Sequence, residues 1–180
     1  MPADPFVLHV ARLRRLQGTR RHEVLRGSPD QSADADDFPR RAADSRVADD
    51  AEVECDLFLE SFDGGVMVTG ILRAPWSGVC RRCTVEVGGE LALSVRERFC
   101  DEGTGEMVDE DAYSIVDDLL DLRPMIRDAI LPELPLAPLC DEECKGLCVQ
   151  CGTDRNQEEC GCVPPIDPRW ASLDVLRSNS

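Results

Sequence analysis

The spacing of apolar residues changes to a period of two just after Ala51, which predicts the start of a β-sheet. Val53, Cys55, Leu57 and Leu59 recur at every second position, with acids at 54 and 56, as on a strand that buries one face. Asp63-Gly64-Gly65 then predicts a tight turn, and residues 66–72 supply the returning strand. We therefore expect a β-hairpin over residues 53–72.

The same pattern continues through the middle of the chain and then gives way to a helical one. Gly88-Gly89 predicts another turn, followed by a strand over residues 91–97, so the sheet should have about four antiparallel strands. Residues 113–116 predict a short strand. Residues 121–131 predict a helix with Asp121 as its cap and Pro124 in its first turn. Its apolar stripe consists of Leu122, Met125, Ile126, Ala129 and Ile130.

Composition divides the chain into four parts. Residues 1–27 are a basic N-terminal segment, in which residues 6–10 predict a short strand. Residues 28–50 are an acidic linker or disordered loop, because they contain few large apolar residues. Residues 51–139 form an α+β body with a C-x-x-C hairpin. Residues 140–180 form a cysteine-rich tail that ends in a short helix around Trp170.

The charge balance limits the class of partner. The 180-residue chain carries a formal net charge of −16, and such acidity disfavours general binding to polyanions. Either the acidity only keeps the chain in solution, or its natural partner is a basic protein or the positive surface of a ribonucleoprotein. The basic N-terminal segment is the exception, and two interpretations of its arginines stay open. In the first interpretation these arginines contact RNA, and in the second they pair with the acidic body. The arginines are Arg12, Arg14, Arg15, Arg20 and Arg21.

Six cysteines lie within a short stretch of the tail. They are Cys140, Cys144, Cys148, Cys151, Cys160 and Cys162. Gaps of two and three residues followed by a longer gap are typical of tetrahedral Zn²⁺ sites, and Cys148-Val-Gln-Cys151-Gly152 is typical of a zinc knuckle. The N-terminus has no signal-peptide pattern and no apolar run approaches the roughly 20 residues of a membrane span. A cytoplasmic location is therefore expected, in which clustered thiols favour zinc over disulfides.

The favoured zinc site draws on Cys144, Cys148, Cys151 and Cys160, with Cys140 and Cys162 as substitutes. A second group, Cys80-x-x-Cys83, supplies either two ligands of a second site, a redox pair, or structural thiols. Its strand-like surroundings disfavour thioredoxin-type catalysis, which expects the motif at the start of a helix. Cys55 and Cys100 are the remaining candidates for completing that second site. We see no catalytic constellation, and expect that the protein is not an enzyme.

An ordered set of motifs resembles the bacterial YceD-like family, also named large ribosomal RNA subunit accumulation proteins. The motifs are V-E-C at 53–55, C-R-R-C at 80–83, R-F-C at 98–100, a helix leading into P-L-A-P-L-C at 135–140, G-L-C-V-Q-C-G-T-D-R-N at 146–156, and D-P-R-W-A-S-L at 167–173. The resemblance implies a non-enzymatic cytoplasmic factor for large-subunit rRNA accumulation or processing and ribosome assembly. Family genes commonly neighbour one for a small basic ribosomal protein, which suggests a partner.

The sequence thus predicts an α+β protein, with an antiparallel β-sheet, a packed helix and a C-terminal cysteine-rich zinc knuckle. Structural Zn²⁺ is the expected cofactor. The expected partner is a basic large-subunit ribosomal protein or a precursor of the large subunit. The alternative function is a zinc–thiolate redox sensor, in which oxidation of the cysteines releases the metal.

Overall fold

The described part of the protein is built around one large, curved β-sheet and α2 (Arg123–Ile130), the longest described helix, which has about two turns. The computed structural model describes residues 4–28, 41–48, 50–101, 112–163 and 169. Within them the strands are β1 Val7–His9, β2 Arg20–Gly27, β3 Arg41–Ala42, β4 Ser45–Arg46, β5 Val53–Phe62, β6 Gly65–Val79, β7 Glu86–Asp101, β8 Tyr113–Val116 and β9 Leu119–Asp121. The helices are α1 Ala11–Arg14, α2 Arg123–Ile130 and the 3₁₀ turn η2 Leu131–Glu133.

The nine strands belong to one sheet, larger than the expected four-stranded one. The path runs β1-β9-β8-β7-β6, and β6 pairs with β5 along one part of its length and with β4 near its end. All pairings are antiparallel except β7 with β8, so the sheet is mixed. β2 pairs with β5 over all eight of its residues, and β1 pairs with β9. The segments on either side of the predicted boundary at residue 27 therefore lie in one sheet.

The predicted hairpin at Asp63-Gly64 is confirmed, whereas the predicted turn at Gly88-Gly89 is wrong. Phe62 pairs with Gly65 across the first turn. Gly88 and Gly89 instead lie within β7, opposite Ser77 and Trp76 of β6. A Cβ at Gly89 would lie 3.1 Å from Nε1 of Trp76, so this glycine leaves room for the indole beside the strand. The chain reverses earlier, between Val79 and Glu86.

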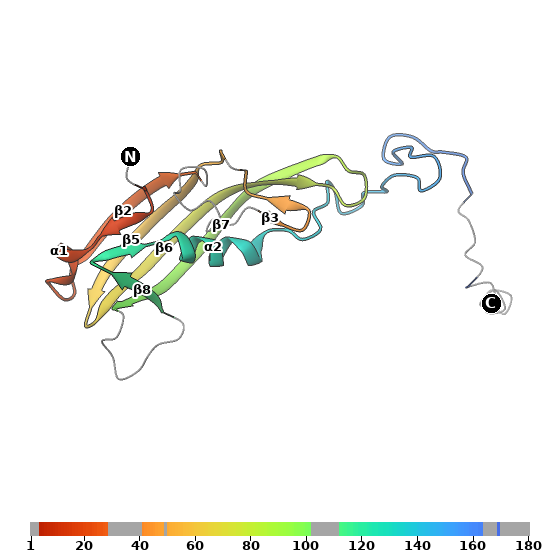
Figure 1. Cartoon of the computed structure of the whole chain (residues 1–180). Coiled ribbons are helices and arrows are strands. Elements are labelled where there is room, and N and C mark those ends of the chain that lie inside the picture. The colour runs from red at the N-terminus through yellow and green to blue at the C-terminus, as the bar shows by residue number, and fades with distance from the viewer. Residues whose placement is uncertain (1–3, 29–40, 49, 102–111, 164–168, 170–180) are drawn as a thin grey trace.

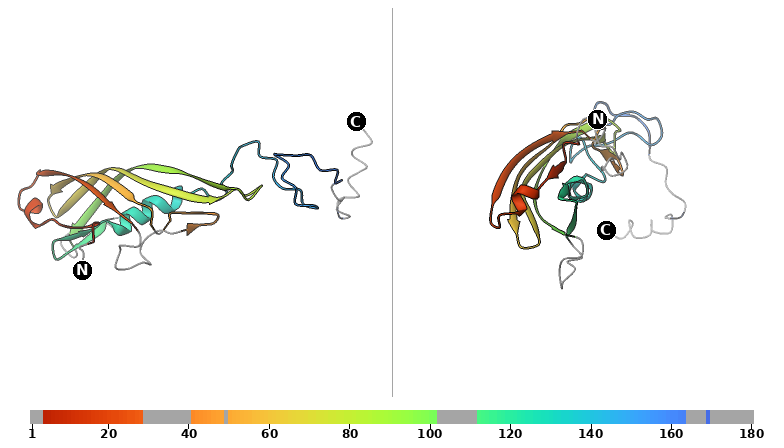
Figure 2. Two further views of the ribbon diagram at one scale, coloured as in Figure 1. Left: turned by 90° about the horizontal axis from the view of Figure 1, so that it is seen from above. Right: turned by 60° about the vertical axis from the view of Figure 1, so that its left-hand side comes forward.

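The core lies between the concave face of the sheet and α2. The predicted alternation of β5 is confirmed, since Val53, Cys55, Leu57 and Leu59 are fully buried. The predicted stripe of α2 is also confirmed, because Leu122, Met125, Ile126 and Ile130 are buried and Ala129 packs against the core. Figure 1 shows α2 lying along one face of the sheet, and the two views of Figure 2 show the sheet curving around it.

The chain enters α2 directly from β9. Leu122 rather than Asp121 is the N-terminal cap residue, but Asp121 Oδ1 accepts a hydrogen bond of 3.0 Å from the backbone N–H of Arg123. The carboxylate of Asp121 thus satisfies a donor that the helix leaves free, as the sequence predicts. The C-terminal helix expected around Trp170 lies outside the described residues, as do residues 29–40 and 49 of the expected linker.

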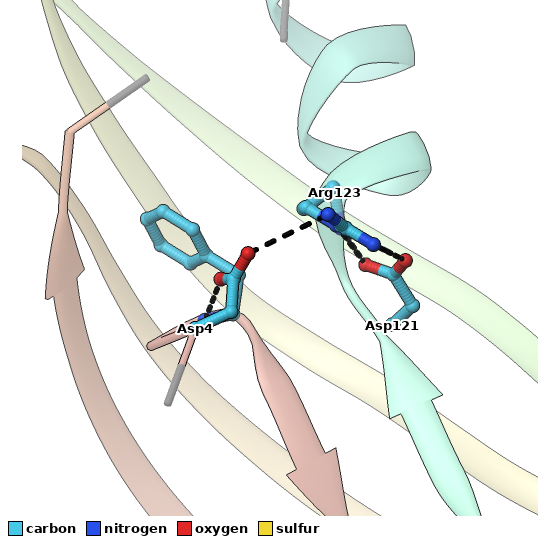
Figure 3. Close-up of polar contacts among 4 residues, drawn as sticks. Asp4, Asp121 and Arg123 are labelled. Atoms are coloured by element: carbon cyan, nitrogen blue, oxygen red, sulfur yellow. Dashed lines mark hydrogen bonds and ion pairs between the residues drawn. The ribbon is translucent and has the colours of Figure 1, made fainter. Parts of the chain in front are cut away.

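Arg123 ties the N-terminal segment to the start of α2. Its guanidinium lies 2.6 Å from Oδ2 of Asp121 and 3.5 Å from Oδ2 of Asp4 (Figure 3). Asp4 in turn accepts a hydrogen bond of 2.9 Å from the N–H of Phe6, and the carbonyl of Phe6 accepts one from the N–H of Leu122. Both Arg123 and Asp4 have largely buried side chains. These contacts hold Phe6 in the core.

The contact of Arg123 predicts an unequal cost for two substitutions on α2. Arg123→Ala leaves the largely buried carboxylate of Asp4 and the partly exposed one of Asp121 without their cation, and should lower the free energy of unfolding by about 2–4 kcal/mol. Arg127→Ala, which removes a more exposed pair with Asp128, should cost less than about 1 kcal/mol. Denaturant unfolding of the two variants measures both values, and equal costs would contradict this role of Arg123.

Candidate metal centres

The ten described cysteines are all free thiols, and eight of them gather into two groups of four. The first quartet consists of Cys80, Cys83, Cys140 and Cys144. The second quartet consists of Cys148, Cys151, Cys160 and Cys162. In each quartet the four sulfurs lie within 4.8 Å of one another. The tip of the β6–β7 hairpin points away from α1, and the chain of residues 140–163 runs from near this tip away from the sheet (Figure 1).

The loop between β6 and β7 presents the first two sulfurs. The backbone N–H of Cys80 bonds to the carbonyl of Val85, and the N–H of Thr84 bonds to the carbonyl of Cys80. Thr84 has a positive φ of 60°, which lets this short loop turn back on itself. The loop therefore holds Cys80 and Cys83 on a rigid hairpin end, and not at the start of a helix as thioredoxin-type catalysis would need.

The segment after α2 brings the other two sulfurs of the first quartet to this loop. The carbonyl of Pro135 accepts a hydrogen bond of 2.5 Å from Ser45 Oγ, and that of Pro138 accepts one of 2.9 Å from the N–H of Arg81. Arg82 then donates to the carbonyls of Glu142 and Cys144 at 3.0 and 2.9 Å. Residues 134–144 are thus fixed along β4 and the hairpin end by hydrogen bonds to their backbone carbonyls.

The sulfur separations in the first quartet fit a tetrahedral metal. Sγ of Cys80 lies 3.9 Å from Sγ of Cys144, and Sγ of Cys83 lies 3.5 Å from Sγ of Cys140. Four sulfurs at about 2.3 Å from one Zn²⁺ would lie about 3.8 Å apart, whereas a disulfide needs about 2.05 Å. Nδ2 of Asn156 also donates to Sγ of Cys144 at 3.3 Å, which is the type of outer contact that orients a thiolate ligand.

The second quartet is built by a knuckle at residues 148–153 and by the returning segment that carries Cys160 and Cys162. The N–H of Gly152 bonds to the carbonyl of Cys148, and the N–H of Cys148 bonds to the carbonyl of Thr153. Gly152 has φ of +75°, which confirms the expected need for glycine after the second cysteine. Nε2 of Gln150 donates to the carbonyl of Val163 at 2.7 Å and so holds the segment with Cys160 and Cys162 in place.

The two quartets differ in burial. Cys80, Cys83 and Cys144 are at most 8% exposed, although Cys140 is exposed. In the second quartet Cys151 is exposed and the other three are half-buried. Few apolar side chains support this part of the tail: Leu147 is half-buried, while Val149 and Val163 are largely exposed. A bound metal would therefore supply much of the free energy that folds residues 145–163.

The thiols of each quartet influence one another's protonation. Burial raises the pKa of Cys80, but hydrogen bonds from the backbone N–H groups of Cys140, Cys83 and Arg82 bring it down to about 6. The neighbouring thiols of Cys83 and Cys144 raise the pKa of Cys140 to about 12. One sulfur thus ionises readily, while another keeps its proton because further negative charge in so small a space is unfavourable.

The second quartet also contains one thiol with a lowered pKa and one with a raised pKa. Hydrogen bonds from the side chain and backbone of Thr153 lower the pKa of Cys151 to about 6, and Cys151 raises the pKa of Cys162 to about 12. A divalent cation would remove this conflict by stabilising all four thiolates at once. The donor set therefore fits Zn²⁺, and its binding would release protons.

The expected assignment of cysteines to sites differs from these groups. The favoured set is divided, because Cys144 lies with Cys80, Cys83 and Cys140, while Cys148, Cys151 and Cys160 lie with Cys162. The three residues between Cys144 and Cys148 connect one quartet to the next. Ligation of Zn²⁺ by any of these residues stays a prediction.

Cys55 and Cys100 lie far from Cys80 and Cys83, so they do not complete that site. Cys55 pairs with Leu72 and Cys100 with Gly65, eight and fifteen residues before Cys80 along the chain. At about 3.3 Å per residue these are separations of roughly 26 and 50 Å. Burial raises the pKa of Cys55 to about 12, so it packs as a neutral thiol in the apolar core.

Comparison with known proteins assigns the family. The profile of large ribosomal RNA subunit accumulation protein YceD matches residues 68–177, which include both quartets. The chain belongs to the YceD family. This chain is 36% identical to Rv2926c of Mycobacterium tuberculosis over 178 residues, which cover 95% of this chain and 81% of the relative. It is 30% identical to YlbN of Bacillus subtilis over 147 residues, or 76% of each chain.

A plant relative of this YceD-family chain has a functional name. The chloroplastic YCED homolog 1 of Arabidopsis thaliana, a large ribosomal RNA subunit accumulation protein, is 37% identical over 43 residues, covering 24% of this chain and 13% of the relative. No solved structure matches the chain. The family name associates this YceD-family protein with the accumulation of large-subunit ribosomal RNA. Neither described α-helix has the length and apolar character to cross a bilayer.

Metal analysis of YceD-family variants tests the two quartets. We expect about two Zn²⁺ per chain in the reduced protein, and one fewer in either Cys80→Ser with Cys83→Ser or Cys160→Ser with Cys162→Ser. Cys55→Ala, a change to a core cysteine, is the control and should keep both. One Zn²⁺ in the wild type that survives loss of Cys80 and Cys83 would instead favour the single site expected from sequence.

Proposed function

We propose that this protein supports the accumulation and processing of large-subunit rRNA during ribosome assembly, without catalysing a reaction itself. Membership of the YceD family carries this proposal. Its proposed setting is the cytoplasm, where thiols stay reduced and available for zinc. The proposed role of Zn²⁺ is structural, because each cysteine quartet offers four sulfurs and so leaves no open position for a substrate.

The charge around the quartets supports a basic partner. Exposed carboxylates cluster on the described part of the tail, at Asp141, Glu142, Glu143, Glu158 and Glu159. Only Lys145 and Arg155 oppose them between residues 140 and 163. A hollow of about 340 Å³ beside the first quartet is lined by Asp141, Glu143 and Asp154 among others. A basic large-subunit ribosomal protein, free or in a precursor particle, would meet complementary charge here.

The arginines of residues 12–21 give less support to an RNA-binding arm. Arg14 contacts Asp101 and Asp118, and Arg21 lies 2.7 Å from Glu23. Arg20 lies over the ring of Phe58 on β5. Arg12 and Arg15, in and next to α1, are exposed. The contacts of Arg14 agree with the interpretation that these side chains pair with the acidic body, whereas Arg21 pairs with a carboxylate of its own segment.

Depletion of the protein from its own cells tests the proposed function. We expect the ratio of mature large-subunit to small-subunit rRNA to fall, with precursors of the large-subunit rRNA accumulating, because the large subunit loses an assembly factor. Re-expression of the wild-type chain should restore the ratio and serves as the control. An unchanged ratio in cells shown to lack the protein would contradict the proposal.

A second candidate function, a zinc–thiolate redox sensor, is supported by the exposure of the second quartet. Cys151 is exposed and its pKa is lowered to about 6, so it would react readily with peroxide if the metal left its sulfur free. This function predicts that mild peroxide at neutral pH releases about one Zn²⁺ per chain and that a thiol reductant restores binding. The Cys160→Ser, Cys162→Ser variant should release none from this quartet. Retention of all zinc under peroxide would exclude the sensor.

A further inference from the structure

The face of the sheet that points away from α2 has a composition unlike that of the whole chain. We define this convex face as the outward-pointing residues of β2 from 20 to 26, of β5 from 54 to 60, of β6 from 67 to 73 and of β7 from 92 to 98. The strand pairing aligns them in rows; one row is His22, Phe58, Thr69 and Arg96, and the next is Arg20, Glu60, Met67 and Arg98. All residues of the convex face are exposed or half-buried.

The convex face is basic on an acidic protein. It carries five arginines and three carboxylates, whereas the whole chain has 20 basic and 36 acidic residues. The arginines are Arg20, Arg26, Arg73, Arg96 and Arg98, and the carboxylates are Glu54, Asp56 and Glu60. Strand pairing therefore gathers arginines from three separate strands, β2, β6 and β7, onto one surface. In both views of Figure 2, α2 lies only on the opposite, concave side.

Two of the three carboxylates, Glu54 and Asp56, pair with basic side chains toward one end of this surface. At the other end Glu60 is the one carboxylate of the convex face beside three arginines, Arg20, Arg96 and Arg98. Glu54 lies 2.6 Å from Arg26 and 3.2 Å from Arg73, and Asp56 lies 2.6 Å from Nε2 of His22. Arg96 lies on β7 toward the end of the sheet that carries the turn between β5 and β6. It has no ion-pair partner among the described residues. Arg98 lies next to it on the same face of β7, about 7 Å further along the strand.

Planar side chains lie beside these arginines. The guanidinium of Arg20 is 4.0 Å from the centroid of the Phe58 ring, and the imidazole of His22 stacks on the same ring at 4.6 Å with 26° between the planes. Single-stranded RNA is bound by sheets that offer flat groups for base stacking next to cations for phosphates. Double-stranded RNA hides its base faces and would use only the charges.

We propose that the convex face binds single-stranded RNA, with Arg96 and Arg98 contacting phosphates and the Arg20–Phe58–His22 stack contacting bases. The inference deepens the proposed function, on which it rests, by naming the RNA-contacting surface of the same protein. It places that surface on the sheet and not on the N-terminal arginines. The acidic tail remains available for a basic protein at the far end of the β6–β7 hairpin.

Binding of the full-length, zinc-loaded chain to a fluorescent 16-nucleotide single-stranded RNA tests the inference. The double variant Arg96→Gln, Arg98→Gln should bind more weakly than the wild type at low salt. The ratio of wild-type to variant affinity should be about 25-fold larger at 0.1 M salt than at 1 M, because each lost phosphate contact contributes a salt slope of about 0.7. The slope of log affinity against log salt should fall by about 1.4. Arg12→Gln with Arg15→Gln removes the same charge from in and next to α1, and should leave affinity and slope nearly unchanged.

Three outcomes would overturn the inference: no binding of the RNA by the wild-type chain, equal weakening by both double variants, or equal affinity for a duplex of the same length. If the double variant loses zinc or unfolds, Arg96→Glu alone replaces it, since Arg96 has no ion-pair partner among the described residues. A chain that binds no RNA but whose depletion lowers large-subunit rRNA refutes this surface and leaves the proposed function intact. RNA binding at the convex face without any effect of depletion supports the surface and refutes the proposed function.

Discussion

Burial of one face of α2 against the concave side of the sheet is the interaction on which the other features depend. The helix contributes Leu122, Met125, Ile126 and Ile130 to a core that has no second helix layer among the described residues. The same core cluster includes residues from strands far apart along the chain, from Val53 on β5 to Leu120 on β9. The position of α2 also decides where the chain after it travels, and so where Cys140 and Cys144 arrive.

The sheet separates three surfaces with different chemistry. Its concave side is apolar and filled, its convex side is basic, and the hairpin end carries clustered sulfurs and carboxylates. The length of the β6–β7 hairpin keeps the basic convex face apart from the acidic hairpin end. β6 and β7 pair from Gly65–Cys100 to Val79–Glu86, a length of roughly 45 Å. A positive surface and a negative one can thus coexist on a chain of net charge −16 without neutralising each other.

Local patterns in the sequence predicted the elements, and long-range pairing explains what they missed. The apolar positions from Val53 to Leu59 were sufficient to predict β5, and the apolar stripe was sufficient to predict α2, because the buried face of each is apolar over these residues. β2 was missed as a strand because its inward positions include Arg21 and Glu23, which pair with each other and give no alternation of apolar and polar residues. The spacing of neighbouring cysteines could not predict how they group, because the first quartet joins residues that are 57 and 64 positions apart in the sequence.

This separation has a consequence for the order in which the protein forms during translation. Cys80 and Cys83 leave the ribosome roughly 3–12 s before Cys144, at synthesis rates of about 5–20 residues per second. During that interval two sulfurs of the first quartet have no partners from the chain. The nascent protein therefore passes through a period in which only half of this candidate metal site has been synthesised, and in which cellular reductants must keep its two thiols reduced.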